Sequence, residues 1–191
     1  DGGDTVFGNV FFRCGEPARG NMGAVFSHGG HDLNIENNVF IECKRAVGAS
    51  PWSDGHWKKM LKGATYQTRL LEEVDITRAP FTTRYPALVG FMDYNGEPRR
   101  SYARRNLAVM CGEFIYGNYD QEDNWVTGTD PGFRDIARGD FALTSDAQVF
   151  EEIPGFKPIP FHDMGLVRSA LRPDPPKEAW SYSPPEQLAH P

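Results

Sequence analysis

The side chains best suited to acid–base chemistry gather around two Gly-Gly pairs. Asp4 follows the first pair in "DGGD", and Asp32 follows the second in "SHGGHD", where His28 and His31 stand on either side of the glycines. Paired carboxylates hydrolyse glycosidic bonds when one acts as an acid and the other as a base or nucleophile. Histidines beside them bind hydroxyl groups or shift the pKa of a carboxyl group. The two stretches therefore predict a candidate site for glycoside hydrolysis.

Three aspartates compete for the catalytic roles. We assign Asp32 as one catalytic carboxylate, Asp1 as its preferred partner and Asp4 as the reserve, with His28 and His31 as substrate contacts. The first copy of the turn has no histidine where the second has His31, so His31 and Asp32 exceed what the turn itself requires. The competing interpretation, in which each aspartate only caps a turn, stays open. We expect no metal and no cofactor, because no further ligand at metal-site spacing accompanies these residues.

A sequence repeat predicts the elements that position these side chains. "GGDTVFGNVFFRC" at residues 2–14 and "GGHDLNIENNVFIEC" at residues 29–43 share a glycine pair, an aspartate and the run Asn-Val-Phe-x-x-Cys. Their asparagines, Asn9 and Asn38, are 29 residues apart, and "NLAVMC" from Asn106 is a weaker third copy. A repeat of this length with short β-prone runs is typical of the coils of a parallel β-solenoid.

Strand alternation assigns the repeated run to a buried face. The residues one, three and five after each asparagine are apolar or cysteine, as in Val39, Ile41 and Cys43. We therefore expect Cys14, Cys43 and Cys111 to be unpaired core residues stacked in register, in preference to metal ligands or nucleophiles. The asparagines are expected to adopt the left-handed conformation of a sharp bend and to hydrogen-bond along a ladder.

Several stretches resemble the C-terminal part of right-handed parallel β-helix proteins: "GNVFFRCG", "VFSHGGHDLNIENNVFIECKRAVG", "TTRYPAL" and the run of residues 130–166. The best-known members of that group are secreted bacterial polysaccharide-degrading enzymes, including β-helix glycoside hydrolases that act on fucose- or xylose-containing glycans. The resemblance covers most of residues 1–172. It implies an all-β, right-handed parallel β-helix fold and a secreted, periplasmic or cell-surface location. It also implies acidic active-site residues at the "DG" of one coil and the "GG-x-D" of the next, which correspond to Asp1 and Asp32.

The chain divides into a β-helix domain over residues 1–172 and a Pro-rich tail over residues 173–191. Helical spacing predicts an insertion of one or two helices between about residues 51 and 76. Turn-rich aromatic sequence predicts an irregular C-terminal cap over about residues 117–172, and the tail is expected to be poorly ordered. Trp52 and Trp57 are candidates to stack on sugar rings or to hold the insertion in place. Arg84 is a further candidate substrate contact.

Composition and charge disfavour several partners. The chain has 191 residues and a net charge of −6, and an acidic chain lacks the concentrated basic surface that phosphate contacts need. No stretch approaches the ~20 apolar residues of a membrane span. The first residues lack the basic and apolar regions of a signal peptide. Because the sequence opens within a coil, we expect a piece of a longer protein that associates through its N-terminal end when isolated.

These observations favour a carbohydrate-active enzyme, a glycoside hydrolase with a polysaccharide or oligosaccharide substrate. A non-catalytic β-helix for glycan binding or adhesion is the main alternative. A β-helix polysaccharide lyase is the third interpretation. Such lyases use a Lys or Arg base, often with calcium held by clustered carboxylates, and neither feature accompanies the Gly-Gly pairs.

Overall fold

The computed structural model describes residues 3–15, 22–29, 31–50, 53–93, 101–164, 169–171 and 173. The chain forms two compact units, the first made of residues 1–50 and 100–191 and the second of residues 51–99. The strands of the described residues all lie in the first unit.

The first unit is built around three sheets whose strands pair in parallel. The first sheet contains, in spatial order, β1 (Thr5–Phe7), β4 (Asn34–Glu36), β7 (Tyr102–Arg104) and β10 (Asp120–Glu122). The second contains β2 (Val10–Phe12), β5 (Val39–Ile41), β8 (Leu107–Val109) and β11 (Trp125–Thr127). The third contains β3 (Val25–His28), β6 (Arg45–Ser50) and β9 (Glu113–Tyr116).

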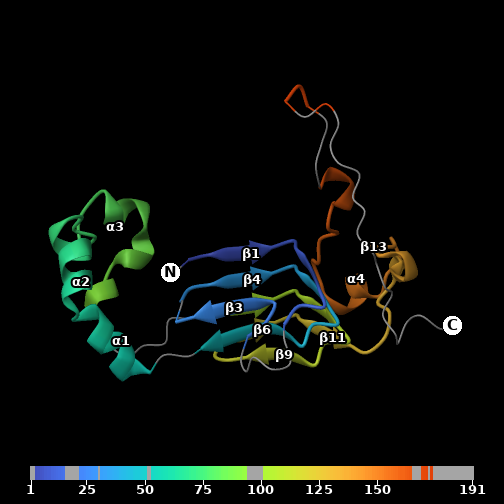
Figure 1. The fold of residues 1–191 in the computed structure, drawn as a ribbon, viewed down its shortest axis with the longest axis horizontal. Coiled ribbons are helices and arrows are strands. Elements are labelled where there is room, and N and C mark those ends of the chain that lie inside the picture. The colour runs from blue at the N-terminus through green and yellow to red at the C-terminus, as the bar shows by residue number, and fades with distance from the viewer. Residues whose placement is uncertain are drawn as a thin grey trace. The chain divides into compact units, whose positions relative to one another are not determined.

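Each pass of the chain adds one strand to each sheet before the order repeats. β1 to β3 form the first coil, β4 to β6 the second and β7 to β9 the third, and a fourth coil contributes β10 and β11. Figure 1 shows β3, β6 and β9 as successive layers. Strands begin at the residue after Asn9, Asn38 and Asn106 and pair in parallel, as the repeat predicted. The stacking is compatible with a β-helix-like solenoid.

Four asparagines form a hydrogen-bonded ladder between the first and second sheets. The backbone amide and the Nδ2 group of Asn9 donate to Oδ1 of Asn38, at 3.0 and 3.1 Å. Asn38 donates in the same way to Asn106, and Asn106 to Asn124. Asn38 and Asn106 are completely buried, so the ladder satisfies polar groups that the core would otherwise leave unpaired. The predicted ladder is therefore confirmed, and Asn124 adds a step that the repeat did not reveal.

The sharp bend ahead of the ladder belongs to the residue before each asparagine. Gly8, Asn37, Arg105 and Asp123 have φ angles from 48° to 69°, in the left-handed region. The ladder asparagines are not among the described residues with positive φ. The prediction that the asparagine itself adopts the left-handed conformation is therefore wrong, and its role is the side-chain ladder.

Both faces of the second sheet are buried at its two central strands, β5 and β8. Phe40 packs inside the coils, where its ring stacks on that of Phe11 with centroids 5.0 Å apart. Val39 and Ile41 belong to a different cluster, formed with the C-terminal segment. The next residue, Glu42, has a left-handed φ of 48°, and Cys43 then joins the cluster of Phe40. The prediction that Val39, Ile41 and Cys43 share one face is therefore wrong.

The C-terminal part of the first unit covers the outer face of the second sheet. It contains the antiparallel strands β12 (Phe133–Asp135) and β13 (Asp140–Leu143), the helix α4 (Val149–Glu152) and 3-10 turns at Ile136–Arg138 and Phe161–Asp163. Val149 and Ile153 are completely buried in the cluster that contains Val39 and Ile41. Residues 120–127, which the sequence assigned to the cap, form β10 and β11 instead.

The second unit is helical. It contains α1 (Asp54–Leu61), α2 (Ala64–Gln67), a π-helical turn at Thr68–Glu72, α3 (Phe81–Arg84) and 3-10 turns at Pro86–Leu88 and Phe91–Asp93. α1 begins after Ser53, whose hydroxyl accepts a hydrogen bond from the backbone amide of His56. Helical turns therefore continue beyond the expected limit near residue 76. Throughout the described chain, the helices are too short or too polar to cross a membrane.

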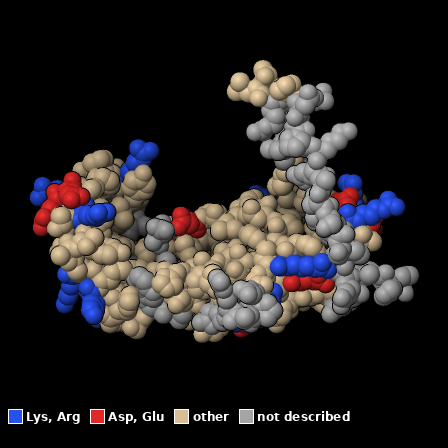
Figure 2. Space-filling view, in the orientation of Figure 1, with Lys and Arg blue, Asp and Glu red and all other residues tan. Residues whose placement is uncertain are grey.

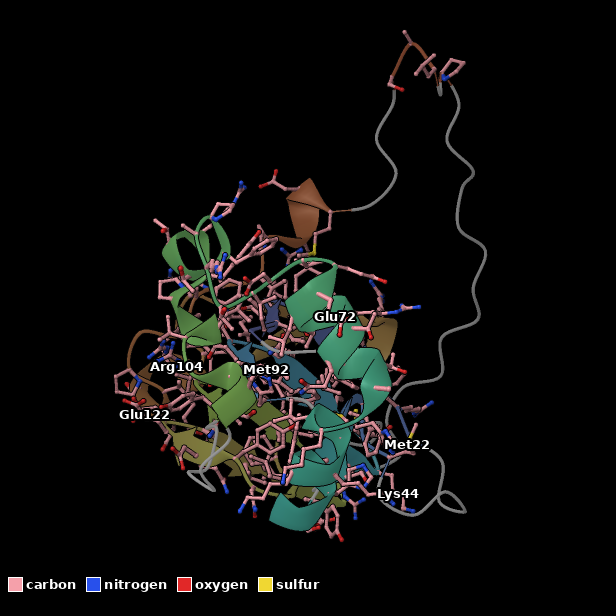
Figure 3. The ribbon with its side chains drawn as sticks, turned by 90° about the vertical axis from the view of Figure 1, so that its left-hand side faces the viewer. Met22, Lys44, Glu72, Met92, Arg104 and Glu122 are labelled. Atoms are coloured by element: carbon pink, nitrogen blue, oxygen red, sulfur yellow. The ribbon has the colours of Figure 1, made fainter. Side chains whose placement is uncertain are left out.

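Charged side chains pair between successive coils. Glu42 accepts a hydrogen bond from Arg13 at 2.6 Å, across 29 residues of sequence, and Glu113 pairs with Arg45 across 68 residues. The asparagine ladder has the same two spacings. Acidic and basic side chains also lie next to each other at the right-hand end of the face in Figure 2. Figure 3 shows Arg104 and Glu122 close together, as the register of β7 and β10 requires.

Candidate functional site

An open pocket of about 200 Å³ lies between β1, β3 and β4. Its lining consists of Asp4, Val6, Val25, Phe26, Ser27, His28, Leu33 and Ile35. Most of this wall is apolar, and Asp4, Ser27 and His28 supply side chains that can hydrogen-bond a ligand or transfer a proton. The structure thus brings together two residues that the sequence had singled out, Asp4 and His28.

Backbone hydrogen bonds join the residues around Asp4 to those around Asp32, on neighbouring coils. The amide of Gly3 donates to the carbonyl of His31 at 3.2 Å, and the amide of Asn34 donates to the carbonyl of Asp4 at 2.9 Å. Residues 31–34 of the second coil therefore lie next to Gly3 and Asp4, which come just before β1.

His31 and Asp32 form a closely paired dyad. Nδ1 of His31 and Oδ2 of Asp32 are 2.6 Å apart, and the side chain of His31 is 12% exposed against 36% for Asp32. When Asp32 accepts the proton on Nδ1, Nε2 is the ring nitrogen that can act as a base. The backbone of Asp32 has a φ of 53°, a left-handed conformation that Asp tolerates better than most residues. Asp32 thus serves the turn and the dyad together.

Ser27 connects the pocket to a buried tyrosine, Tyr119, which lies between β9 and β10. Burial raises the pKa of Tyr119, and a hydrogen bond with Ser27 opposes part of that effect. The hydroxyl of Tyr119 also donates to the carbonyl of Gly48 at 3.4 Å. Sequence reasoning missed Ser27 and Tyr119, because the two residues come from different coils and belong to no shared motif.

The remaining candidates lie apart from this group in the chain. Asp1 and Trp52 are outside the described residues. Trp57, on α1, and Arg84, at the end of α3, belong to the second unit. The guanidinium of Arg84 lies over the ring of the neighbouring Tyr85, 5.9 Å from its centroid. Among the described residues, the pocket and the dyad therefore rest on Asp4, Ser27, His28, His31 and Asp32.

The cysteines form a stack inside the first unit. The Sγ atom of Cys43 contacts the carbonyl of Phe11 at 3.4 Å, and that of Cys111 contacts the carbonyl of Phe40 at 3.6 Å. The hydrogen bond with Cys111, together with burial, raises the pKa of Cys43, and burial raises that of Cys14. All three cysteines are unpaired, as predicted, but only Cys43 is fully buried and the other two are half-buried. The same hydrogen bond lowers the pKa of Cys111, so a raised pKa disfavours a nucleophilic thiolate at Cys14 and Cys43.

A charged cluster on the outer face of the first sheet was not predicted. Glu36 accepts hydrogen bonds from Nδ2 of Asn34 at 2.9 Å and from Nε of Arg104 at 3.2 Å, and it also pairs with Arg105. Burial acts to raise the pKa of Glu36, but the hydrogen bonds from Asn34 and Arg105 and the two positive charges outweigh it, so the pKa is lowered. The adjacent arginines were the only sequence signal of this cluster.

Within the described ranges, no group of three or more His, Cys, Asp and Glu side chains is arranged to hold a metal ion. Comparison of the chain with protein-family models, with curated proteins and with solved structures finds no match. The pocket and the dyad are the features of the described residues that bear on function.

Proposed function

We propose that the chain is part of a right-handed parallel β-helix protein that hydrolyses glycosidic bonds in a polysaccharide. The observation that carries this proposal is the pocket that contains Asp4 and His28, on the coil next to the His31–Asp32 dyad. Acidic groups on neighbouring coils of a parallel stack suit a reaction that needs two carboxylates. The same proposal makes the protein secreted, periplasmic or attached to the cell surface.

The proposal gives each polar group near the pocket a role. Asp4 and Asp32 are the two carboxylates, one acting as the acid and the other as the base or nucleophile. His31 holds the carboxylate of Asp32 in one orientation and offers Nε2 for proton transfer. His28 and Ser27 bind sugar hydroxyls, and Val25 and Phe26 supply part of the apolar wall.

Non-catalytic glycan binding is the second candidate function, and the geometry of Asp32 favours it. A left-handed backbone and a close histidine partner give Asp32 a sufficient structural reason to be there. In that case the pocket binds a sugar through Asp4, Ser27 and His28, with no bond cleavage.

Release of reducing ends from xylan and from a fucose-containing polysaccharide tests the proposal. The unmodified protein should cleave at least one of them, and Asp4→Asn and Asp32→Asn should each lower turnover by about 10²–10⁴-fold. Both variants should melt within a few degrees of the parent, because Asn keeps the shape and tolerates positive φ.

Asp123→Asn is the matched control for Asp32→Asn. Asp123 also has a left-handed backbone, with a φ of 48°, and it lies between β10 and β11. The control variant should keep full activity. Binding of the same glycans in affinity electrophoresis without cleavage would establish the non-catalytic alternative, and neither binding nor cleavage would overturn both.

A further inference from the structure

Three thiols form a column inside the first unit. Cys14, Cys43 and Cys111 lie two residues after the ends of β2, β5 and β8, respectively, so each follows a strand of the second sheet. The residue before each cysteine has a φ between 48° and 52°, in the left-handed region. Because the three coils make the same bend, they place the three thiols at the same level on successive coils.

The backbone at this level fixes the distance between neighbouring cysteines. The amide of Lys44 donates to the carbonyl of Cys14, and the amide of Gly112 donates to the carbonyl of Cys43, both at 3.0 Å. Chains joined by such bonds in a parallel sheet lie ~4.8 Å apart. The Cα atoms of a disulfide are usually about 4.4–6.8 Å apart, so each cysteine lies within bonding range of the cysteine on the next coil.

The second and third coils approach each other closely beside Cys43 and Cys111, whose side chains hydrogen-bond to each other. A Cβ atom at Gly112, the residue after Cys111, would lie 2.7 Å from the carbonyl oxygen of Lys44, so this approach requires glycine. The Cβ atoms of in-register cysteines are also ~4.8 Å apart. This is slightly more than the roughly 3.5–4.5 Å of a disulfide, so bond formation needs only a small local shift.

Cys111 has the properties of the thiol that reacts first. It is half-buried, whereas Cys43 is fully buried. The hydrogen bond with Cys43 lowers the pKa of Cys111, and the same bond together with burial raises the pKa of Cys43. Because the thiolate is the nucleophile in disulfide exchange, Cys111 supplies it. Oxidation of Cys111 removes the largest cause of the raised pKa of Cys43, so Cys43 can attack in turn.

We propose that Cys43 and Cys111 are a site of oxidation by small-molecule disulfides, which join the second and third coils through a disulfide bond. The thiolate of Cys111 attacks one sulfur of the reagent, breaks the S–S bond and releases one thiolate. Cys43 then loses its proton and attacks Sγ of Cys111, which releases the second thiolate. Two protein thiols are oxidised, one reagent disulfide is reduced to two thiols, and Cys14 takes no part.

The disulfide would bracket the helical unit. Residues 51–99 lie between Cys43 and Cys111 in the chain, so the bond ties together the coil that precedes this unit and the coil that follows it. The inference does not depend on the proposed function, although disulfides persist in the secreted or periplasmic location that the proposed function entails. Oxidation is measured on the thiols and the proposed function as glycan cleavage, so the failure of one is distinct from the failure of the other.

Reaction of the folded chain with 4,4′-dithiodipyridine tests the proposal, because each thiolate that this disulfide releases is measured by absorbance as thiopyridone. Cys14→Ala keeps only the proposed pair. It should release two equivalents and lose the mass of two hydrogen atoms, with no adduct retained. The matched control combines Cys14→Ala with Cys43→Ala, and it should release one equivalent and retain one pyridyl adduct on Cys111. A retained adduct on the Cys14→Ala protein, or no release from it, would overturn the proposal.

Peptide mapping of the oxidised parent requires no variant. Trypsin places the three cysteines on different peptides, which cover residues 14–19, 20–44 and 106–134. Under native conditions, the peptide of residues 20–44 should be linked to that of residues 106–134, and dithiothreitol should separate them. In urea, the shorter loop favours a link between Cys14 and Cys43, which are 29 residues apart against 68 for the proposed pair. A native link between Cys14 and Cys43, or the same links with and without urea, would contradict the proposal.

Discussion

Asn38 and Asn106 are joined by two hydrogen bonds, since the backbone amide and the Nδ2 group of Asn38 both donate to Oδ1 of Asn106, at 3.1 and 3.0 Å. Nδ2 of Asn38 also contacts the carbonyl oxygens of Val6 and Glu36, at 2.9 and 3.0 Å. One buried side chain therefore links three successive coils. Replacing this side chain should destabilise the fold, because its partners would be left buried without a hydrogen bond and have no access to water.

Replacement of Asn38 by alanine should lower the free energy of unfolding by about 3 kcal/mol, because it leaves several buried polar groups without partners. Asn9→Ala is the matched control, since Asn9 makes an equivalent contact but is exposed. It should cost no more than about 1 kcal/mol. Urea titration measures both, and equal losses for the two variants would contradict a ladder whose strength depends on burial.

The C-terminal segment should contribute to stability like part of the core. Ile153 is completely buried in the cluster that covers the outer face of the second sheet. Ile153→Ala should therefore lower the free energy of unfolding by about 2–5 kcal/mol. Val126→Ala, at an apolar position that is 53% exposed, should change it by less than about 1 kcal/mol. A small effect at Ile153 in urea titration would mean that the segment packs only loosely.

The sequence predicted the parallel stacking because the repeated asparagines carry a physical signal. Each buried asparagine side chain hydrogen-bonds to the asparagine at the equivalent position of the next coil. The ladder therefore requires asparagine at the same position in each copy of the repeat. Asn124 was missed because the fourth coil is only 18 residues after the third and lacks the Val-Phe-x-x-Cys run. The asparagine was also assigned the bend that its neighbour makes, since both roles suit the same residue type.

Other features could not follow from the sequence. Strand alternation predicts that only one face of the second sheet is buried. The all-apolar run of Val39, Phe40 and Ile41 was the only sign in the sequence that the C-terminal segment also buries the second face. For the candidate site, Asp4 and His28 were found because they flank the Gly-Gly turns. The Ser27–Tyr119 contact depends on which coils lie next to each other, and no motif encodes that relationship.

Glu36 should make stability depend on acidity. Its lowered pKa in the folded protein means that the unfolded chain binds a proton first as the pH falls. The stabilisation is therefore complete above the unfolded pKa of about 4.3 and is lost as the pH falls through the lower folded value. Glu36→Gln should be less stable than the parent at pH 7, and the difference should shrink towards pH 3.

Urea titrations at the two pH values provide this measurement, with Glu73→Gln as the control. Glu73 is exposed and lies in the second unit, so its replacement should change stability little at either pH. A Glu36→Gln deficit that is the same at pH 7 and pH 3 would show that the loss reflects packing and not the ionised carboxylate.

Cys43 should impose the opposite dependence, at alkaline pH. Its pKa is raised by the hydrogen bond with Cys111 and by burial, so the folded protein keeps the thiol proton at a pH where the unfolded chain has lost it. The resulting stabilisation is complete below the unfolded pKa of about 8.5 and is lost as the pH rises above it.

Cys43→Ala should cost about 1 kcal/mol at pH 7 through a small cavity. Thermal midpoints of the parent should then fall more steeply than those of the variant between pH 8 and pH 10. Comparing the two proteins removes the contribution of lysines and tyrosines that titrate in the same range. Because the same hydrogen bond lowers the pKa of Cys111 and Cys43→Ala removes it, the difference between the curves reports on the pair of thiols. Parallel curves would show that folding does not make the pair retain a proton.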